Sequence, residues 1–236
     1  MSNTSLKQES FVSLKFIENL FKHKAKPLED NKGRESSIFK LPKLDYEEAY
    51  LKRKFEQIFN KSLLVSGLSL LRLNEPTKPH VDGLPPTSII YDSYGKKKKY
   101  KFLKVGIILL AFDTDYDVEN LSTDIILFKN HLEFIPGGLE LEHHVKSGMS
   151  NLDIPWRDYN GKLLDQSPQN FTDDEENFPH VFVTHKKLAE GITIDKKYNM
   201  KIGDMVCFNP YQLHCTKRFQ NFESKILCRF QILEPV

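Results

Sequence analysis

The sequence has few cysteines and no long apolar run. Its three cysteines, Cys207, Cys215 and Cys228, form no C-x-x-C pair, which argues against a disulfide framework or a structural zinc site and favours a reducing compartment. No stretch of about 18 apolar residues exists, and the N-terminus lacks the basic and then apolar order of a signal peptide. We therefore expect a cytoplasmic protein with no membrane partner.

Neither sign of charge is in large excess. The 34 basic and 32 acidic residues leave a formal net charge of +2, so no global field points to nucleic acid. With 236 residues, of which 39% are hydrophobic, the chain is long enough for one domain with a substantial core. The composition therefore indicates a single globular domain and does not identify its partner.

The first part of the chain predicts two helices. Apolar residues recur at spacings of three and four in residues 9–24 and again in residues 45–60, where the second segment begins with a sequence that resembles a capping box. The polar linker 27–42 predicts an irregular segment. We expect residues 1–62 to form a helical support for the rest of the domain.

The remaining chain, residues 63–236, changes to short apolar runs separated by turn-like segments. Helices followed by many short strands are typical of an antiparallel sheet or barrel with helices packed on one side. Two polar, turn-rich stretches, 95–99 and 140–177, are interpreted as surface insertions. The apolar runs predict strands at 63–73, 105–112, 124–128, 180–184, 205–208 and 226–232.

His80 and Asp82 form an H-x-D triplet on a segment that reads as extended. Residues two apart on a strand project from the same face, as two adjacent ligands of one metal require. With one more imidazole they would form the facial triad of non-haem Fe(II) oxygenases, which leaves positions open for a bidentate 2-oxo acid and dioxygen. The triplet therefore predicts two of the three protein ligands of an iron site.

His214 is the preferred third ligand. It follows residues 203–210, which predict a turn, a buried strand and a stop, and this places it at the mouth of the predicted barrel. His143 and His144 are rival ligands because Glu140 and Glu142 lie beside them, but they fall in the predicted insertion.

Residues 225–232 alternate strictly between two faces. Lys225, Leu227, Arg229 and Gln231 share one face, and the opposite face is apolar and is expected to pack on the N-terminal helices. Two cations inside a barrel would be costly unless they met an anion. A dicarboxylate cosubstrate would supply that anion.

Residues 70–83 read Leu-Leu-Arg-Leu-Asn-Glu-Pro-Thr-Lys-Pro-His-Val-Asp-Gly. This segment resembles the R-Y-x-x-G-x-x-x-x-x-H-x-D-G entry motif of prolyl-hydroxylase-like 2-oxoglutarate oxygenases. In that family, a base that follows the second histidine binds the far carboxylate of the cosubstrate. Lys225 and Arg229 both qualify, 11 and 15 residues after the histidine (225 − 214 and 229 − 214). The tyrosine of the motif is a leucine here, so a hydroxyl partner for the cosubstrate is expected from Tyr91 or Thr123.

The resemblance implies a mainly β fold with N-terminal helices, in the form of a double-stranded β-helix (a jelly roll or cupin-like barrel). It also implies a dioxygenase that uses Fe(II), 2-oxoglutarate and dioxygen to hydroxylate a small-molecule or peptide substrate. Asp82 argues against halogenation, because halogenating relatives carry a small residue at that position. A non-catalytic jelly-roll binding or assembly protein and a cupin-type metalloenzyme without 2-oxoglutarate are the alternatives.

Overall fold

In a computed structural model, the described residues of the chain form antiparallel β-sheets and two helices. The model describes residues 5–22, 26–27, 36–40, 45–77, 87–91, 97–131, 194–210 and 212–236. Its helices are α1 (Leu14–Lys22) and α2 (Asp45–Phe59), with a 3₁₀ turn η1 (Val118–Asn120). Within these ranges, neither helix has the length and apolar character needed to cross a membrane. The strands are β1 (Leu6–Gln8), β2 (Lys26–Pro27), β3 (Ser36–Lys40), β4 (Leu64–Leu73), β5 (Thr87–Tyr91), β6 (Lys97–Asp113), β7 (Thr123–His131), β8 (Ile194–Met200), β9 (Met205–Phe208), β10 (Gln212–Thr216) and β11 (Ser224–Pro235).

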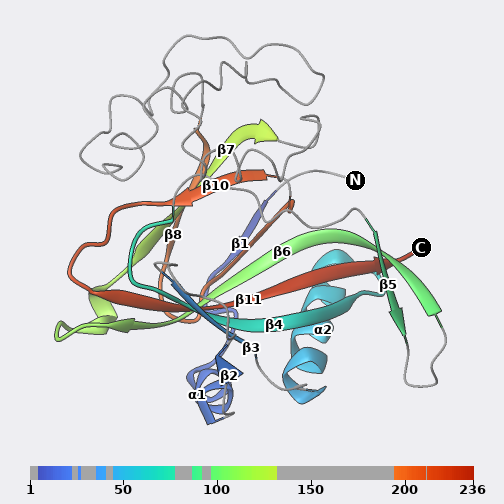
Figure 1. Ribbon diagram of the computed structural model, residues 1–236, viewed down its shortest axis with the longest axis horizontal. Helices are drawn as coiled ribbons and strands as arrows, with labels where there is room; N and C mark the ends of the chain where they lie inside the picture. The colour runs from blue at the N-terminus through green and yellow to red at the C-terminus, as the bar shows by residue number, and fades with distance from the viewer. Residues whose placement is uncertain are drawn as a thin grey trace.

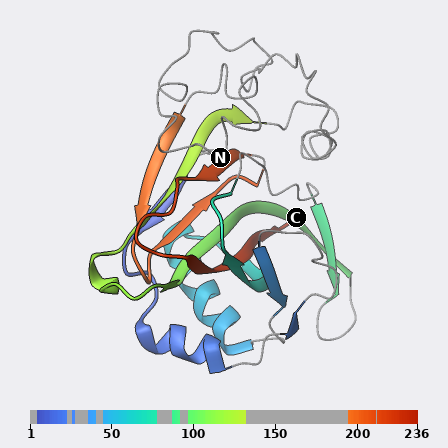
Figure 2. The same ribbon diagram turned by 60° about the vertical axis from the view of Figure 1, so that its left-hand side comes forward.

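The strands form a larger and a smaller sheet. The larger sheet runs in the order β1-β9-β6-β11-β4-β3-β2, and β5 pairs with β6 outside this path. The smaller sheet has the order β10-β7-β8. In Figures 1 and 2, the smaller sheet lies on one side of the larger sheet, and α1 and α2 lie on the other. The structure is therefore mostly β, with two packed sheets and few helices.

Two hydrophobic clusters hold these layers together. The first packs α1 and α2 against the larger sheet and includes Leu20, Phe55 and Phe230. The second lies between the sheets and includes Leu127 of β7 and Leu227 of β11. Strand β11 contributes to both clusters because successive side chains of a strand point to opposite faces. The expectation that its apolar face packs on the N-terminal helices is confirmed.

Helix α1 begins later than its apolar periodicity predicts. Ser10 and Val12 lie before the helix, and their backbone N–H groups donate to the turn that precedes β9. The acceptors are the Asp204 carboxylate at 2.9 Å and the Gly203 carbonyl at 3.1 Å. The hydroxyl of Ser13 then accepts a backbone N–H of the first turn, as an N-cap residue does. These bonds fix the start of α1 at residue 14.

Two segments predicted to be irregular form strands instead. Residues 36–40, inside the predicted linker, form β3 and pair with β4. Residues 97–99, inside the predicted insertion 95–99, begin β6 and pair with β5. In both cases a neighbouring strand satisfies the backbone hydrogen bonds, and this tertiary pairing outweighs local polarity. The predicted strand 180–184 and the insertion 140–177 lie outside the described residues.

Gly106 of β6 lies directly against the ring of Phe230, its partner on β11. A methyl group on Gly106 would lie 2.3 Å from ring atoms Cε2 and Cζ, and the ring is fully buried against Phe55 of α2. We expect Gly106→Ala to lower the free energy of unfolding by about 1–3 kcal/mol, as overpacking does. Urea unfolding measures this loss.

Gly67→Ala is the matched control for this substitution. Gly67 also lies in a strand and has a φ of +69°, but the nearest atoms to its added methyl group would be those of the Gln231 side chain, at an ordinary 3.6 Å or more. Its cost is confined to the backbone conformation, about 1 kcal/mol. A loss for Gly106→Ala that does not exceed the loss for Gly67→Ala would contradict the proposed clash.

Candidate functional site

Two of the predicted site residues are not described, and a third is placed by its backbone alone. His80 and Asp82 lie outside the described residues. Tyr91 is the last residue of β5, opposite Lys97 in the ladder with β6, and its side chain is not described. Within the ranges that the structure describes, no three His, Cys, Asp or Glu side chains gather into a group that could hold a metal ion. The roles predicted for these residues therefore stay predictions.

His214 faces the space between the two sheets. It lies opposite Leu127 in the ladder between β10 and β7, and directly opposed residues share a face of the sheet. Leu127 belongs to the hydrophobic cluster between the sheets, and so does Phe208, whose ring centroid lies 4.5 Å from the His214 ring centroid. Only 4% of His214 is exposed. The imidazole is therefore part of the interior.

The hydrogen bond of His214 fits a metal-binding role. Its Nδ1 lies 3.0 Å from the backbone oxygen of Gln212. A carbonyl oxygen can only accept, so Nδ1 carries the proton, and a neutral ring then has its lone pair on Nε2. Histidine ligands of metals are commonly held in this way by a backbone carbonyl. This hydrogen bond of His214 is therefore compatible with a metal bound through Nε2.

Gln212 is a polar interior residue that the sequence interpretation missed. It is 2% exposed, and its Nε2 donates to the backbone oxygen of Phe128 at 2.9 Å. Its Oε1 is buried and has no hydrogen-bond partner among the described residues. Its position two residues before His214 in the same strand is the signal that could have identified it. A buried carbonyl oxygen without a donor suits a site whose ligand or bound water supplies one.

The segment that leads to the H-x-D triplet is bound to β10. The Thr77 backbone N–H donates to the Thr216 hydroxyl at 2.8 Å, and the Thr216 N–H donates to the Thr77 carbonyl at 3.3 Å. Thr216 is two residues from His214 on the same strand. Thr77 precedes His80 by three residues, which span at most about 11 Å when fully extended. The covalent chain therefore allows His80 to reach His214.

Lys225 and Thr123 meet across the space between the sheets. Lys225 is fully buried on β11, and its Nζ donates to the hydroxyl of Thr123, the first residue of β7, at 2.7 Å. The same Nζ lies 4.8 Å from the centroid of the Phe219 ring. The structure thus brings together one of the two predicted bases and one of the two predicted hydroxyl groups. Phe219 was not predicted, and no pattern in the sequence identifies it.

The surroundings of Lys225 disfavour its charged form. Burial lowers the pKa of its ammonium group from the ordinary 10.5 to about 7, although the nearby Asp124 carboxylate and Cys215 act in the opposite direction. Among the described residues, no carboxylate forms an ion pair with Lys225. An anion that entered this space would therefore stabilise the ammonium form.

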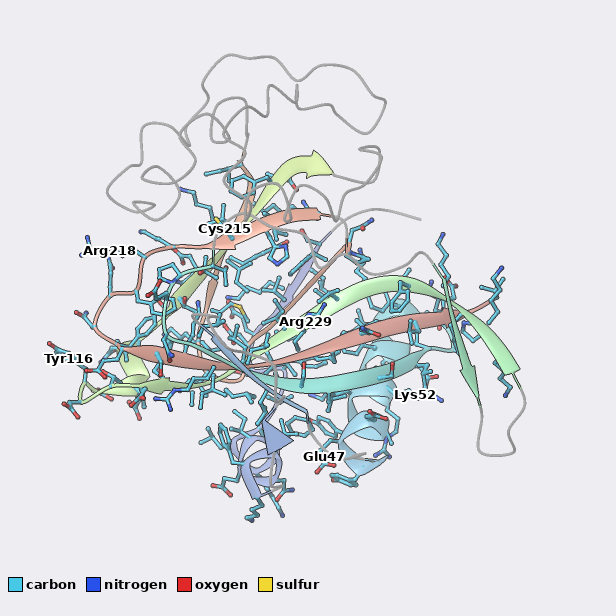
Figure 3. The ribbon with its side chains drawn as sticks, in the orientation of Figure 1. Glu47, Lys52, Tyr116, Cys215, Arg218 and Arg229 are labelled. Atoms are coloured by element: carbon cyan, nitrogen blue, oxygen red, sulfur yellow. The ribbon has the colours of Figure 1, made fainter. Side chains whose placement is uncertain are left out.

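Arg229 also belongs to the inner face of β11. Its partners in the ladders are Ser69 of β4 and Ile107 of β6, and Ile107 is a member of the cluster between the sheets. Figure 3 shows Arg229 on the side of β11 that faces β10, where Cys215 is labelled. Arg229 is half-buried and lies four residues, about 13 Å along the strand, from Lys225. Of the two predicted bases, Lys225 is the more deeply buried, and it contacts Thr123.

The depressed pKa of Lys225 predicts a pH-dependent contribution to stability. Its folded-state pKa, about 7, is below the unfolded value of 10.5, so the unfolded chain binds more protons between these pH values. The free energy of unfolding therefore rises with pH in this window, by on the order of 1 kcal/mol per pH unit. Lys225→Met removes this contribution. Urea unfolding at pH 7, 8 and 9 should show the wild type gaining stability relative to Lys225→Met, whereas parallel profiles would exclude this titration.

No protein-family model and no curated protein matches this sequence. Among solved structures, the chain is similar to a viral collagen prolyl hydroxylase from Paramecium bursaria Chlorella virus-1 in complex with 2OG, at 10% identity over 97% of this chain and 94% of that chain, with a TM-score of 0.45. It is also similar to HygX from Streptomyces hygroscopicus with nickel and 2-oxoglutarate bound, at 12% identity over 97% and 82% of the chains and a TM-score of 0.42. A third likeness is to SnoN, a non-heme alpha ketoglutarate dependent epimerase from nogalamycin biosynthesis, at 11% identity over 98% and 77% of the chains and a TM-score of 0.45. At these identities and TM-scores, the likeness assigns no activity to this chain.

Proposed function

We propose that this chain is an Fe(II)- and 2-oxoglutarate-dependent dioxygenase with a double-stranded β-helix fold, which hydroxylates a small-molecule or peptide substrate. One observation carries the proposal. Lys225 is fully buried between the sheets, and Thr123 rather than a carboxylate holds its Nζ. An anion that bound there would stabilise the ammonium form of this buried amine, and a dicarboxylate cosubstrate is such an anion.

The metal would be held by His80, Asp82 and His214. His214 supports this assignment because its Nδ1 is hydrogen-bonded to a backbone carbonyl, as the other ring nitrogen of a metal-binding histidine commonly is. The hydrogen bonds between Thr77 and Thr216 support the H-x-D pair, because they bind the chain just before His80 to the strand that carries His214. Two imidazoles and one carboxylate suit Fe(II) and leave one face of the metal to small ligands.

The cosubstrate carboxylate would be held by Lys225 and Thr123. Along β7, Thr123 is four residues from Leu127, which lies opposite His214. Four strand residues span about 13 Å. A ligand that joined a metal at His214 to Lys225 would need a metal-chelating end and an anionic end, as 2-oxoglutarate has.

The chain's own residues bind and orient the reactants and exclude water from them. When bound, iron supplies the activation of dioxygen, for which 2-oxoglutarate supplies two electrons on its decarboxylation to succinate. The apolar side chains of Leu127, Phe208 and Leu227 line the space between the sheets and keep it dry. In that environment, the ion pair between Lys225 and a carboxylate is stronger than it would be in water.

Anaerobic reconstitution with Fe(II) and 2-oxoglutarate tests this function. We expect the visible metal-to-ligand absorption band of an iron-bound 2-oxo acid, and slow succinate formation when dioxygen is admitted. His80→Ala, Asp82→Ala and His214→Ala should each abolish the band, because each removes a ligand. His143→Ala and His144→Ala are matched controls that should retain it, and circular dichroism should show that every variant is folded.

Each negative result of this reconstitution would favour a different alternative. A protein that takes up no stoichiometric iron would be the non-catalytic binding protein of the alternative hypothesis. Iron uptake without the 2-oxoglutarate band would indicate a cupin-type metal site. Loss of the band in His143→Ala or His144→Ala, with its retention in His214→Ala, would reassign the third ligand.

A further inference from the structure

The groups that contact Lys225 directly, among the residues that the structure describes, are neutral. Its Nζ contacts the Thr123 hydroxyl and the Phe219 ring. Its partners in the two strand ladders, Leu73 of β4 and Phe112 of β6, are buried apolar residues of the cluster between the sheets. Paired residues share a face, so both side chains flank the lysine. A protonated amine here loses its hydration without gaining an ion pair, and this favours the neutral amine.

The facing strands of the smaller sheet supply one charged group to Lys225. This group is Asp124 of β7, whose carboxylate accepts a hydrogen bond from Asn199 at 2.9 Å and lies 4.0 Å from Lys217 Nζ. Cys215 of β10 is the other titratable neighbour. Burial raises the pKa of its thiol, which is therefore uncharged at neutral pH. Asp124 already has two other partners, so it compensates Lys225 only in part.

The larger sheet adds no compensating anion among its described residues. Arg72 precedes Leu73 in β4, and Asp113 follows Phe112 in β6. These two residues form an ion pair with each other and are about half exposed. The next charged residue on the inner face of β11 is Arg229, a second cation. In the loop before β11, Arg218 is exposed to solvent.

We propose that the dicarboxylate cosubstrate binds together with one proton, which Lys225 takes up, so that affinity for the cosubstrate falls as the pH rises. The neutral Nζ gains a proton from solvent, the carboxylate stays deprotonated, and the two form an ion pair within the dry interior. This inference rests on the proposed function for the identity of the anion. It adds a sensitivity to pH that an arginine in the same position would not confer, because arginine stays charged.

The size of the effect follows from the protonated fraction of the free protein. The pKa of Lys225 is about 7, and a bound carboxylate raises it by direct attraction. If only the protonated form is competent to bind, the dissociation constant scales inversely with that fraction. The protonated fraction falls from about 76% at pH 6.5 to about 3% at pH 8.5 for a group with this pKa. We therefore expect affinity to weaken by about 25-fold over this range.

Isothermal titration of 2-oxoglutarate into protein saturated with Ni(II), a metal that does not turn over, measures this coupling. Titrations at pH 6.5, 7.5 and 8.5, each in two buffers of different ionisation enthalpy, give both the dissociation constant and the number of protons taken up. We expect proton uptake close to one at pH 8.5 and about a quarter at pH 6.5. This measurement uses the wild-type protein and depends on no variant being folded.

Lys225→Arg is the matched variant. Its guanidinium is charged throughout the range, so 2-oxoglutarate should bind with a pH-independent constant and without proton uptake. Lys225→Met is a second variant, whose side chain is uncharged and fits a buried position. It should bind weakly at every pH and should also lack proton uptake.

The outcomes separate this inference from the function on which it rests. Tight binding by the wild type with no pH dependence and no proton uptake would overturn the inference and leave the dioxygenase function standing. Proton uptake that persists in Lys225→Arg or Lys225→Met would assign the proton to another group and would also overturn it. If 2-oxoglutarate fails to bind the metal-loaded wild type at any pH, the proposed function itself is wrong.

Discussion

The two faces of strand β11 pack against two different hydrophobic clusters, and the rest of the structure depends on this constraint. It lies between β4 and β6 and forms a ladder with each of them. One of its faces therefore supports the helices, and the other lines the space between the sheets. Because both edges of the strand are paired, it cannot rotate to expose Lys225. The packing of Phe230 on α2 thus fixes the lysine inside the sandwich.

The interior between the sheets combines an apolar lining with a few polar side chains. His214, Gln212, Thr123 and Lys225 are all at least nine-tenths buried. Low polarisability strengthens each interaction with a bound ligand, but it also raises the free energy of each group that has no partner. Within the part of the chain that the structure describes, Oε1 of Gln212 has no hydrogen-bond partner, and Asp124 compensates the charge of Lys225 only in part. Both features lower the free energy of unfolding of the free protein, and losses of stability of this kind are common at functional sites.

The sequence predicted the parts of the fold that local periodicity determines. Strand β9 was predicted at its observed bounds, and the two faces of β11 were predicted correctly. Strand β3 was missed because its residues become a strand only when β4 offers them partners. The start of α1 was misplaced because Asp204, nearly 200 residues away in the chain, binds the segment before it.

In the candidate site too, sequence spacing predicted individual residues, whereas their contacts depend on how the sheets pack. Spacing alone indicated His214 and offered two bases and two hydroxyl groups for the cosubstrate. Which base meets which hydroxyl depends on how two sheets pack, and the contact between Lys225 and Thr123 joins residues 102 positions apart. The roles of His80 and Asp82 still rest on their sequence pattern, because the described residues do not include them.

The short first strand has a consequence for how molecules of this protein meet one another. Strand β1 ends the larger sheet and covers β9, whose four residues are all buried. Only three residues long, β1 carries Lys7, which forms ion pairs with Glu9 and Asp204. A short edge strand with a charged side chain is a poor template for a strand of another molecule. The N-terminal segment that binds the turn before β9 therefore also protects a hydrophobic sheet edge from self-association.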